Sequence, residues 1–385
     1  MAHGQRLYYF KRHSHDRHYF SDFDQINQLT ELRAEVPWLA DVPRDVCAQL
    51  LIELDLAWQR WFEKLAEEPK FKKRGRCRVA MCEPHPKGWH IEGNNIFFPK
   101  MGAMRAIIHR PIEGTPKKCC ITRDVDQWFV SIVCEIEMPD VERKPGIVGI
   151  DRGVVNVVAD SNGELIKSPD FLKKGAKKIR HAQRLAARKE KGSNNWKKAQ
   201  LRVARLQRKV RRQRDHFLHP IALHYAESQG TVVVEKLQVR NMTRSARGTK
   251  EKPGKNVRAK AGLNRSILDA GWGKLHGMLK YKMGWRNGLL LEVLAAYSSQ
   301  TCSVCGVVDA RSRRSQSEFV CVACGHTEHA DINAAKVVLG RGNYGLVCNP
   351  AAVAKRPTGQ KLRVARRGTR SKRPVAPKAP AFRPG

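Results

Sequence analysis

The sequence predicts a chain of the α/β class that is built in several parts. Three carboxylates, Asp151, Glu235 and Asp331, each stand at the edge of an expected strand or helix. Two CxxC pairs lie shortly before the third carboxylate. Before residue 140, short apolar runs alternate with Gly/Pro/Lys turns, a pattern typical of antiparallel strands. We therefore expect a helical segment, a small antiparallel sheet or barrel, and an α/β part with a cysteine-rich insert.

The charge of the chain indicates an anionic partner. At 385 residues the chain can form roughly two or three cores, and it carries 73 Lys and Arg against 36 Asp and Glu, a net charge of +37. The longest apolar stretch, residues 288–294, is too short to span a bilayer, and the N-terminus lacks a signal-peptide core. Nucleic acid is therefore the expected partner, and no membrane association is expected.

The first half of the chain shows two patterns. Apolar residues from Cys47 to Phe62 recur every three or four positions and predict a helix, with Trp58 and Trp61 expected in the core rather than as a stacking platform. Residues 76–140 then predict the antiparallel sheet or barrel, with a boundary at residues 139–144. Its clearest apolar runs are Asn95–Phe98, Arg105–Ile108 and Trp128–Cys134.

The second half predicts alternating strands and helices. A meander is expected over residues 148–166, because a Ser161-Asn162-Gly163 turn joins two of its runs. Further strands are expected at Thr231–Glu235 and Leu289–Ala295, and further helices from Ser266 and from Asp331. Residues 243–262 are rich in Gly, Lys and Arg and predict an irregular segment.

Residues 172–214 are almost wholly basic and predict two helices broken at residues 192–195. A run of one sign repels itself unless phosphates lie alongside, whereas an ordinary solvated helix carries both signs. We therefore interpret the run as a nucleic-acid contact. Its principal candidates are Lys173, Lys174, Lys177, Lys178, Arg180, Arg184, Arg188, Arg202, Arg205, Arg208 and Arg212.

Four of the eleven cysteines have metal-ligand spacing. Cys302 and Cys305 form one CxxC pair, Cys321 and Cys324 form the next, and fifteen residues separate the pairs. Four thiolates close a tetrahedral site, so we predict structural Zn²⁺ with no open position for a substrate. The odd total does not fit a secreted disulfide framework, so we expect a reducing cytosol and the other cysteines as small core residues. His326 and His329 are expected to be superfluous to the zinc site.

The three carboxylates are weak signals one at a time. Asp331 could simply cap the helix behind it, Asp151 could be a turn residue, and Glu235 could be the edge of an ordinary strand. If they converge in space, they repel one another and need cations. All-oxygen ligands suit Mg²⁺, and two Mg²⁺ ions would support the in-line hydrolysis of a phosphodiester.

These motifs together resemble a known family. Gly149–Gly153, Val233–Leu237, the double CxxC and Ala330–Ala335 are similar, in order and spacing, to the three RuvC motifs and the zinc ribbon of the TnpB family. Pro37–Leu39, Pro69–Arg76, Ser266-Ile267 with Trp272, and Ser298–Cys302 are similar to further signatures of that family. The resemblance covers about residues 23–340.

The resemblance implies an α/β RNase H-like (RuvC) nuclease with an inserted zinc ribbon, behind a wedge-like β-barrel and an α-helical recognition segment. The expected ranges are 15–75 for the recognition segment and 76–143 for the barrel, to which residues 1–14 could add. The nuclease is expected at 144–300 and 326–340, the zinc ribbon at 301–325 and a basic disordered tail at 341–385.

The resemblance also implies a function. The catalytic acids of the family correspond to Asp151, Glu235 and Asp331, which would hold Mg²⁺. TnpB proteins are RNA-guided endonucleases of mobile elements that cut double-stranded target DNA beside a short target-adjacent motif. A monomeric RNA complex in the prokaryotic cytosol or nucleoid is expected.

Two alternatives stay open at this stage. One is an RNA-guided DNA-binding repressor or a decayed copy without efficient cleavage. It is raised by the roughly twenty dissimilar residues before Phe23, where relatives usually carry a strand and a helix. The other is a strand-transfer transposase, which the resemblance disfavours because the partner enzyme of TnpB performs that reaction with a tyrosine. Arg152 stands at a position that is often leucine in the family.

Overall fold

The N-terminal part is a small helical bundle. The computed structural model describes residues 2–12, 20–71, 79–83, 85–137, 141–249 and 251–348. Helices α1 (Ala2–Arg12), α2 (Asp22–Glu35), α3 (Pro37–Ala40) and α4 (Arg44–Phe62) come first. Arg6 of α1 forms an ion pair of 2.8 Å with Asp55 of α4, and both side chains are buried. Residues 2–12 therefore belong to the helical part and add no strand to the expected barrel.

The helix expected over residues 45–62 is present as α4. Trp58 is 1% exposed and lies among aromatic neighbours, with the Trp61 ring centroid at 5.4 Å and that of Phe10 at 5.7 Å. Trp61 is half-buried. The aromatic side chains of α4 thus pack against α1, as expected of core residues.

Six strands follow in two sheets. One sheet has the order β1 (Val79–Glu83), β5 (Thr115–Asp124), β6 (Gln127–Glu135), and the other β2 (His90–Glu92), β3 (Asn95–Phe98), β4 (Gly102–Arg105). Both are antiparallel, and both contribute to one core, with Ile96, Phe98 and Cys119 at its centre. The described pairings leave the two sheets separate, so closure into a barrel stays a prediction.

Two expectations for this part are wrong. The run Arg105–Ile108 is not a strand, because β4 ends at Arg105 and Ile107 is 90% exposed in the following loop. Cys82 and Cys120 are not free core thiols, because they are direct neighbours across the β1–β5 pairing and form a disulfide.

The C-terminal part is built on a five-stranded mixed sheet. Its order is β11 (Leu289–Val293), β10 (Thr231–Glu235), β7 (Ile147–Asp151), β8 (Asn156–Asp160), β9 (Leu165–Lys167). β10 runs parallel to both β7 and β11, whereas β7, β8 and β9 form the expected antiparallel meander. Every residue of β8 and β10 is buried, because helices cover both faces of the sheet.

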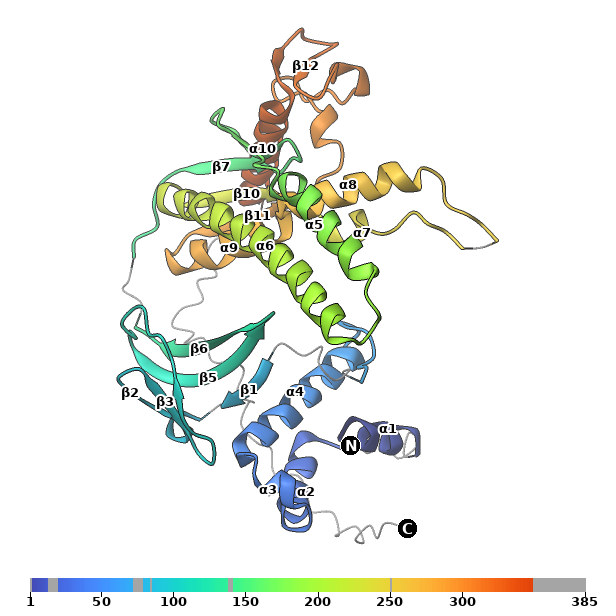
Figure 1. The fold of residues 1–385 in the computed structure, drawn as a ribbon. Helices are drawn as coiled ribbons and strands as arrows, with labels where there is room; N and C mark the ends of the chain where they lie inside the picture. Colours follow the sequence, from blue (N-terminus) through green and yellow to red (C-terminus); the bar gives the residue numbers. More distant parts are fainter. Residues whose placement is uncertain are drawn as a thin grey trace.

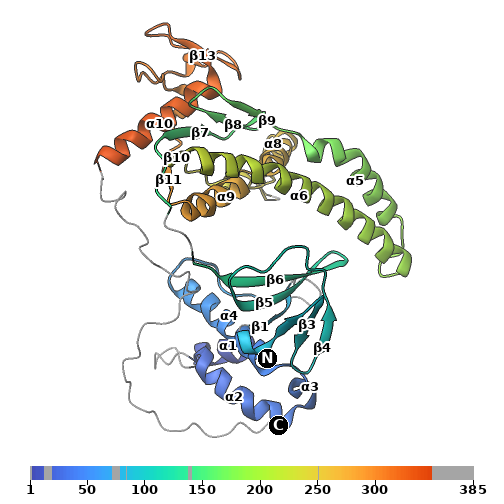
Figure 2. The same ribbon diagram turned by 90° about the vertical axis from the view of Figure 1, so that its left-hand side faces the viewer.

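Helices α6 (Asn194–Ser228) and α9 (Trp272–Trp285) cover one face of this sheet, and α10 (Ala330–Cys348) covers the other (Figures 1 and 2). Leu218, Leu275 and Leu279 of the first two helices pack with Val148 and Val234 of the sheet. α5 (Phe171–Ala187) and α6 form a long hairpin that projects towards the N-terminal part (Figure 2). Two helices are present as expected, but the break between them lies at residues 188–193, earlier than the expected residues 192–195.

Three helix boundaries differ from expectation. The helix expected from Ser266 is two helices, α8 (Val257–Ala270) and α9, because Gly271 adopts a left-handed backbone conformation with φ +72°. α8 begins at Val257, inside the segment expected to be irregular; the short helix α7 (Val239–Met242) precedes that segment. α10 continues to Cys348, eight residues into the expected tail, and residues 349–385 lie outside the described residues.

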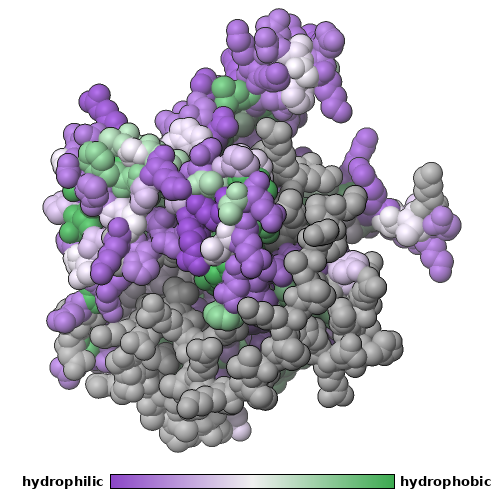
Figure 3. Space-filling model, turned by 90° about the horizontal axis from the view of Figure 1, so that it is seen from below, coloured by the Kyte–Doolittle hydropathy of each residue, from purple (hydrophilic) through white to green (hydrophobic). Residues whose placement is uncertain are grey.

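A small domain inserted between β11 and α10 carries the CxxC pairs (top of Figure 1). It contains two short 3₁₀ helices, η2 (Ser298–Gln300) and η3 (Ala310–Ser312), and the hairpin β12 (Glu318–Val320) and β13 (Thr327–His329). Among the described residues, none of the helices is long and apolar enough to cross a membrane. Where described residues are visible in the view from below Figure 1, their surface is mainly hydrophilic, with smaller apolar patches (Figure 3).

Candidate active site

Asp151 and Glu235 meet at one edge of the mixed sheet. Asp151 is the last residue of β7 and Glu235 is the last residue of β10. The two strands are parallel neighbours, and their register pairs Ile150 with Val234, the residues immediately before the two acids. Parallel strands end at the same edge of a sheet, so the two carboxyl groups are brought together by strand pairing alone.

Asp331 reaches the same place from α10. A Cβ atom on Gly149 would lie 2.3 Å from the backbone oxygen of Ala335 and 2.7 Å from the backbone nitrogen of Leu339. A Cβ atom on Gly342 would lie 2.5 Å from the Val233 side chain. The two glycines thus let α10 lie directly on β7 and β10, and this close packing carries Asp331, in the first turn of α10, to the ends of these strands.

Two neutral side chains and one arginine orient the acids. Asn156 of β8 donates a hydrogen bond of 2.9 Å from Nδ2 to Asp331 Oδ2, and Asn156 is 5% exposed. The hydroxyl of Ser298 donates to Glu235 Oε1. Arg313 lies 3.2 Å from the other oxygen of Asp331. The carboxylate of Asp331 therefore bonds to side chains from two other elements, which is not the arrangement of a helix cap.

Arg152 lies behind the acids and is 5% exposed. Its guanidinium donates to the backbone oxygen of Glu235 and, at 3.5 Å, to that of Trp272. It therefore ties the end of β10 to the start of α9. The sequence offered no signal for this role, nor for those of Asn156, Ser298 and Arg313, because each depends on which strand or loop lies opposite.

Burial and the neighbouring acids make Asp151 unusual. Burial raises the pKa of Asp151 to about 7, and the charges of Glu235 and Asp331 contribute to this rise, against a lowering by Arg313. The pairing of β7 with β10 and the close packing of α10 bring the three acids near one another, and these charge effects follow from that arrangement. The oxygen atoms of the three acids are nevertheless more widely spread than the sulfur atoms of the four cysteines. Among the described residues, the cysteines form the group whose potential ligand atoms all lie within 4.8 Å of one another. Acids gathered in this way fit divalent cations held between them.

The four cysteines form a compact group. Cys302 and Cys324 have their sulfur atoms 3.8 Å apart, and those of Cys305 and Cys321 are 3.5 Å apart. Each CxxC pair is followed by a glycine with positive φ, Gly306 at +75° and Gly325 at +73°. The backbone N–H of Cys324 lowers the pKa of Cys321 to about 6. Thiol spacing, turn geometry and ligand type all fit a tetrahedral Zn²⁺ site.

The two nearby histidines lie outside this group, as expected. His326 is 3.4 Å from Glu328, and His329 Nδ1 accepts a hydrogen bond of 3.2 Å from the backbone of Asp331. Asn333 joins the ribbon to α10, because its side chain bonds to the backbone of Thr301 at 2.8 Å and of Ser303 at 2.9 Å. The cysteine-bearing insert is therefore fastened to the helix that carries Asp331, two residues from that acid.

The expected nucleic-acid residues fall into two groups. Those of α5 and its end are partly or fully exposed, as is Arg202 on α6; the set is Lys173, Lys174, Lys177, Lys178, Arg180, Arg184, Arg188 and Arg202. Within that set, Lys173 forms an exposed ion pair of 3.8 Å with Asp170. Arg205, Arg208 and Arg212 pair with acids from another part of the chain, Asp124 and Asp126 of the β5–β6 turn. In the described conformation these three guanidinium groups are already occupied by carboxylates.

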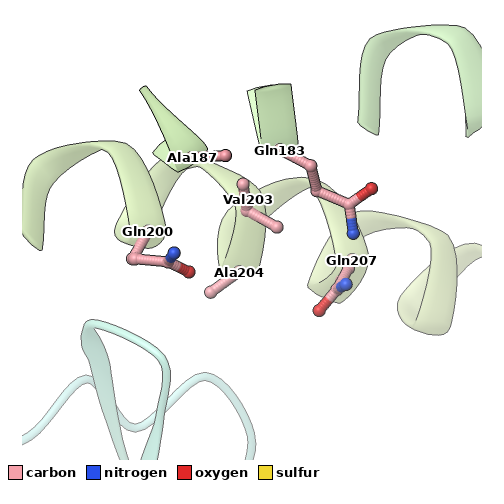
Figure 4. Close-up of a pocket in the computed structure, with 6 residues that line it drawn as sticks. All are labelled: Gln183, Ala187, Gln200, Val203, Ala204 and Gln207. Carbon is pink, nitrogen blue, oxygen red and sulfur yellow. The ribbon is translucent and has the colours of Figure 1, made fainter. Parts of the chain in front are cut away.

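A groove of about 400 Å³ lies between α5 and α6 (Figure 4). It is lined by Gln183, Ala187, Gln200, Val203, Ala204 and Gln207. The lining holds no ionisable side chain, so the groove offers amide hydrogen bonds but no acid–base chemistry. The three candidate catalytic acids lie elsewhere, at the sheet edge.

Comparison with known proteins agrees with the motifs. The profile of the IS605 OrfB family, described as "Probable transposase", matches residues 131–246, and that of the "Cas12f1-like, TNB domain" matches residues 272–338. The "Putative RNA-guided DNA endonuclease InsQ" of Escherichia coli K12 is 38% identical over 329 residues, which cover 85% of this chain and 81% of the relative. The chain belongs to the TnpB family. The resemblance inferred from the sequence motifs is confirmed.

Two further similarities support the TnpB assignment. A "Putative RNA-guided DNA endonuclease" of Streptomyces pristinaespiralis is 31% identical, over 83% of this chain and 77% of the relative. The cryo-EM structure of a Cas12f1–sgRNA–target DNA complex superposes with a TM-score of 0.50 at 15% identity, covering 88% of this chain and 79% of that one. At that identity the superposition shows a shared fold, so this TnpB chain has the Cas12f1 type of fold.

Proposed function

We propose that this TnpB protein is an RNA-guided DNA endonuclease that cuts target DNA at the edge of the mixed sheet. The observation that carries the proposal is the gathering of three acids that are far apart in sequence, at separations of 235−151 = 84 and 331−235 = 96 residues. Relatives over most of the chain are named as RNA-guided DNA endonucleases, which supports the same reaction here.

Asp151, Glu235 and Asp331 would hold Mg²⁺. The donor set is all oxygen, and burial together with the charges of Glu235 and Asp331 raises the pKa of Asp151, an environment that a divalent cation would stabilise when bound. When bound, two Mg²⁺ ions would activate a water molecule and stabilise the departing oxygen of the phosphodiester.

The chain itself contributes orientation and electrostatics. Asn156 and Ser298 each fix one carboxylate through a neutral donor, which leaves the charge of the acid available to a cation. Arg313 adds one positive charge beside Asp331. Gly149 and Gly342 keep α10, and with it Asp331, against the strands that carry the other two acids.

The rest of the molecule would bind the nucleic acids. The exposed cations of α5 suit a phosphate backbone, which they contact without reading sequence. Sequence recognition would belong to base pairing between the guide RNA and target DNA. Zn²⁺ held by Cys302, Cys305, Cys321 and Cys324 would keep the ribbon rigid on α10.

The proposal is tested with purified protein, the RNA transcribed from the DNA flanking the gene, and matched double-stranded DNA. We expect Mg²⁺-dependent cutting, loss of cutting to background in Asp151→Asn, and unchanged RNA affinity in that variant. Glu113→Gln, which changes an exposed carboxylate outside the site, is the matched control and should cut normally. Undiminished cutting by Asp151→Asn would contradict the site, and RNA-dependent DNA binding without cutting by the wild type would favour the repressor alternative.

A further inference from the structure

The turn between β5 and β6 is an acidic tip set against the basic helix α6. Asp126 accepts hydrogen bonds from Arg205 Nε at 2.8 Å and from Arg208 Nη1 at 2.7 Å. Asp124 accepts from Arg211 Nη2 at 2.5 and 2.6 Å and from Arg212 Nη2 at 3.4 Å. Two carboxylates therefore engage four arginines of one helix.

The spacing on both sides makes this a matched surface rather than a set of scattered ion pairs. Arg205, Arg208 and the pair Arg211–Arg212 recur at intervals of three and four residues, so they share one face of α6. Arg208 also donates to the backbone oxygen of Asp124 at 2.7 Å. The guanidinium of Arg212 additionally lies 5.3 Å from the ring centroid of Phe129 on β6. Side chain, backbone and ring contacts from one hairpin thus converge on this face.

The backbone of the turn is strained. Val125, between the two acids, has φ +64°, a left-handed conformation that is unfavourable for a β-branched residue. Asp124 pairs with Gln127, so Val125 and Asp126 form a two-residue hairpin loop, which requires a positive φ at its first residue. Asp124 and Asp126 on either side of Val125 both reach α6, so this tight loop presents the two carboxylates to the helix.

The contact is open to competition by other anions. The side chain of Asp126 is 24% exposed and that of Arg205 55%, in contrast to the buried pair Arg6–Asp55 at 2% and 4%. Arginine binds carboxylate and phosphate through the same paired N–H geometry. The neighbouring helix α5 carries exposed lysines and arginines that attract a polyanion to the same hairpin.

We propose that the Asp124–Asp126 turn is an internal competitor for nucleic acid. In the free protein it holds the β1–β5–β6 sheet on α6, and guide-RNA phosphates replace its carboxylates on Arg205, Arg208, Arg211 and Arg212. The proposal rests on the proposed function for the identity of the polyanion. RNA binding would therefore release the contact of the Asp124–Asp126 turn with α6, and with it the link between the N-terminal sheets and the C-terminal α/β part.

The test measures RNA binding and not cleavage, so it can fail separately from the proposed endonuclease activity. Binding of a fluorescently labelled oligouridine RNA to the full chain is followed by anisotropy over a series of NaCl concentrations. The Asp124→Asn/Asp126→Asn variant is expected to bind about two- to fivefold more tightly at low salt. Its plot of log K against log[NaCl] should be steeper by about 0.7 for each additional phosphate that the arginines bind.

Matched variants separate competition from structural damage. Val125→Gly relieves the strain but keeps both carboxylates, so it should bind RNA with the slope of the wild type. Adding Arg211→Gln to the double variant should remove part of the gain in affinity. Asp126→Asn alone frees Arg205 and removes the carboxylate from Arg208, which keeps its bond to the backbone of Asp124. Asp124 stays on Arg211, and the variant provides the same readout if the double variant does not fold. Unchanged or weaker RNA binding by folded Asp126→Asn or by the double variant would overturn the proposal.

Discussion

Asp151 bears the strongest electrostatic conflict of the site. Its carboxyl group is buried near two other acids, and burial together with those charges raises its pKa to about 7. A group whose pKa is raised on folding binds a proton more tightly in the folded than in the unfolded chain. Ionised Asp151 therefore destabilises the metal-free fold, whereas a bound cation would turn the same charge into a stabilising contact.

This predicts a pH dependence of stability in the metal-free protein. As pH rises from about 4 to about 7, the unfolding free energy should fall by at most about 4 kcal/mol through Asp151. Asp151→Asn should remove most of this fall and should be more stable than the wild type at about pH 8. Urea unfolding in EDTA at a series of pH values measures it. An equal pH dependence in Asp151→Asn and wild type would contradict the assignment.

At the same scale, the limits of sequence reasoning are physical. Asp151 and Glu235 could be identified as candidates because each ends an apolar run, and the end of a strand can be predicted from the neighbouring residues alone. Asn156 and Ser298 could not be found, because each acts by donating a hydrogen bond to a carboxylate that is 175 or 63 residues away in the sequence. Gly149 belonged to a recognised motif, yet its reason, the close passage of α10, is visible only when the helix is in place.

Among the elements, α10 connects the cysteine-bearing insert, the proposed zinc ribbon, to the acids. Asp331 and Asn333 lie in its first turn, and Asn333 bonds to the chain on either side of Cys302. Local pattern predicted this helix and the strands of the mixed sheet. It did not predict the break at Gly271 or the Cys82–Cys120 disulfide, because a continuous apolar stripe hides the first and strand pairing creates the second.

Loss of Zn²⁺ should therefore affect the ribbon first and the start of α10 with it. In Cys321→Ser we expect zinc content to fall to background and amide exchange over residues 301–329 to increase, because four thiolates close the ribbon. Exchange in β7 and β10 should stay slow, since their core is formed with α6 and α9. Cys134→Ser, which changes a free cysteine outside the cluster, is the control for zinc content and exchange. Full zinc content in Cys321→Ser would contradict the ligand set.

For the whole molecule, only part of the net charge of +37 is available to bind a polyanion. Part of the basic face of α6 is neutralised by Asp124 and Asp126, whereas many cations of α5 are exposed. The sequence could show that residues 172–214 are basic, but not that an acidic turn about 80 residues earlier in the chain covers some of them. The difference between exposed cations on α5 and carboxylate-bound arginines on α6 therefore arises only in the folded chain.

The salt dependence of RNA binding should distinguish the exposed cations of α5 from the carboxylate-bound arginines of α6. Neutralising the α5 pair Lys177→Gln/Arg184→Gln should weaken RNA binding and make the slope of log K against log[NaCl] shallower by about 0.7 for each phosphate that the helix no longer binds. Arg205→Gln should have a smaller effect, because in the free protein that arginine already holds Asp126 and RNA gains it only by displacing a carboxylate. Arg286→Gln, which breaks an ion pair of 2.7 Å with Glu227, is the control and should leave the slope unchanged. A slope equal to that of the wild type in the α5 variant would show that phosphates do not lie along this helix.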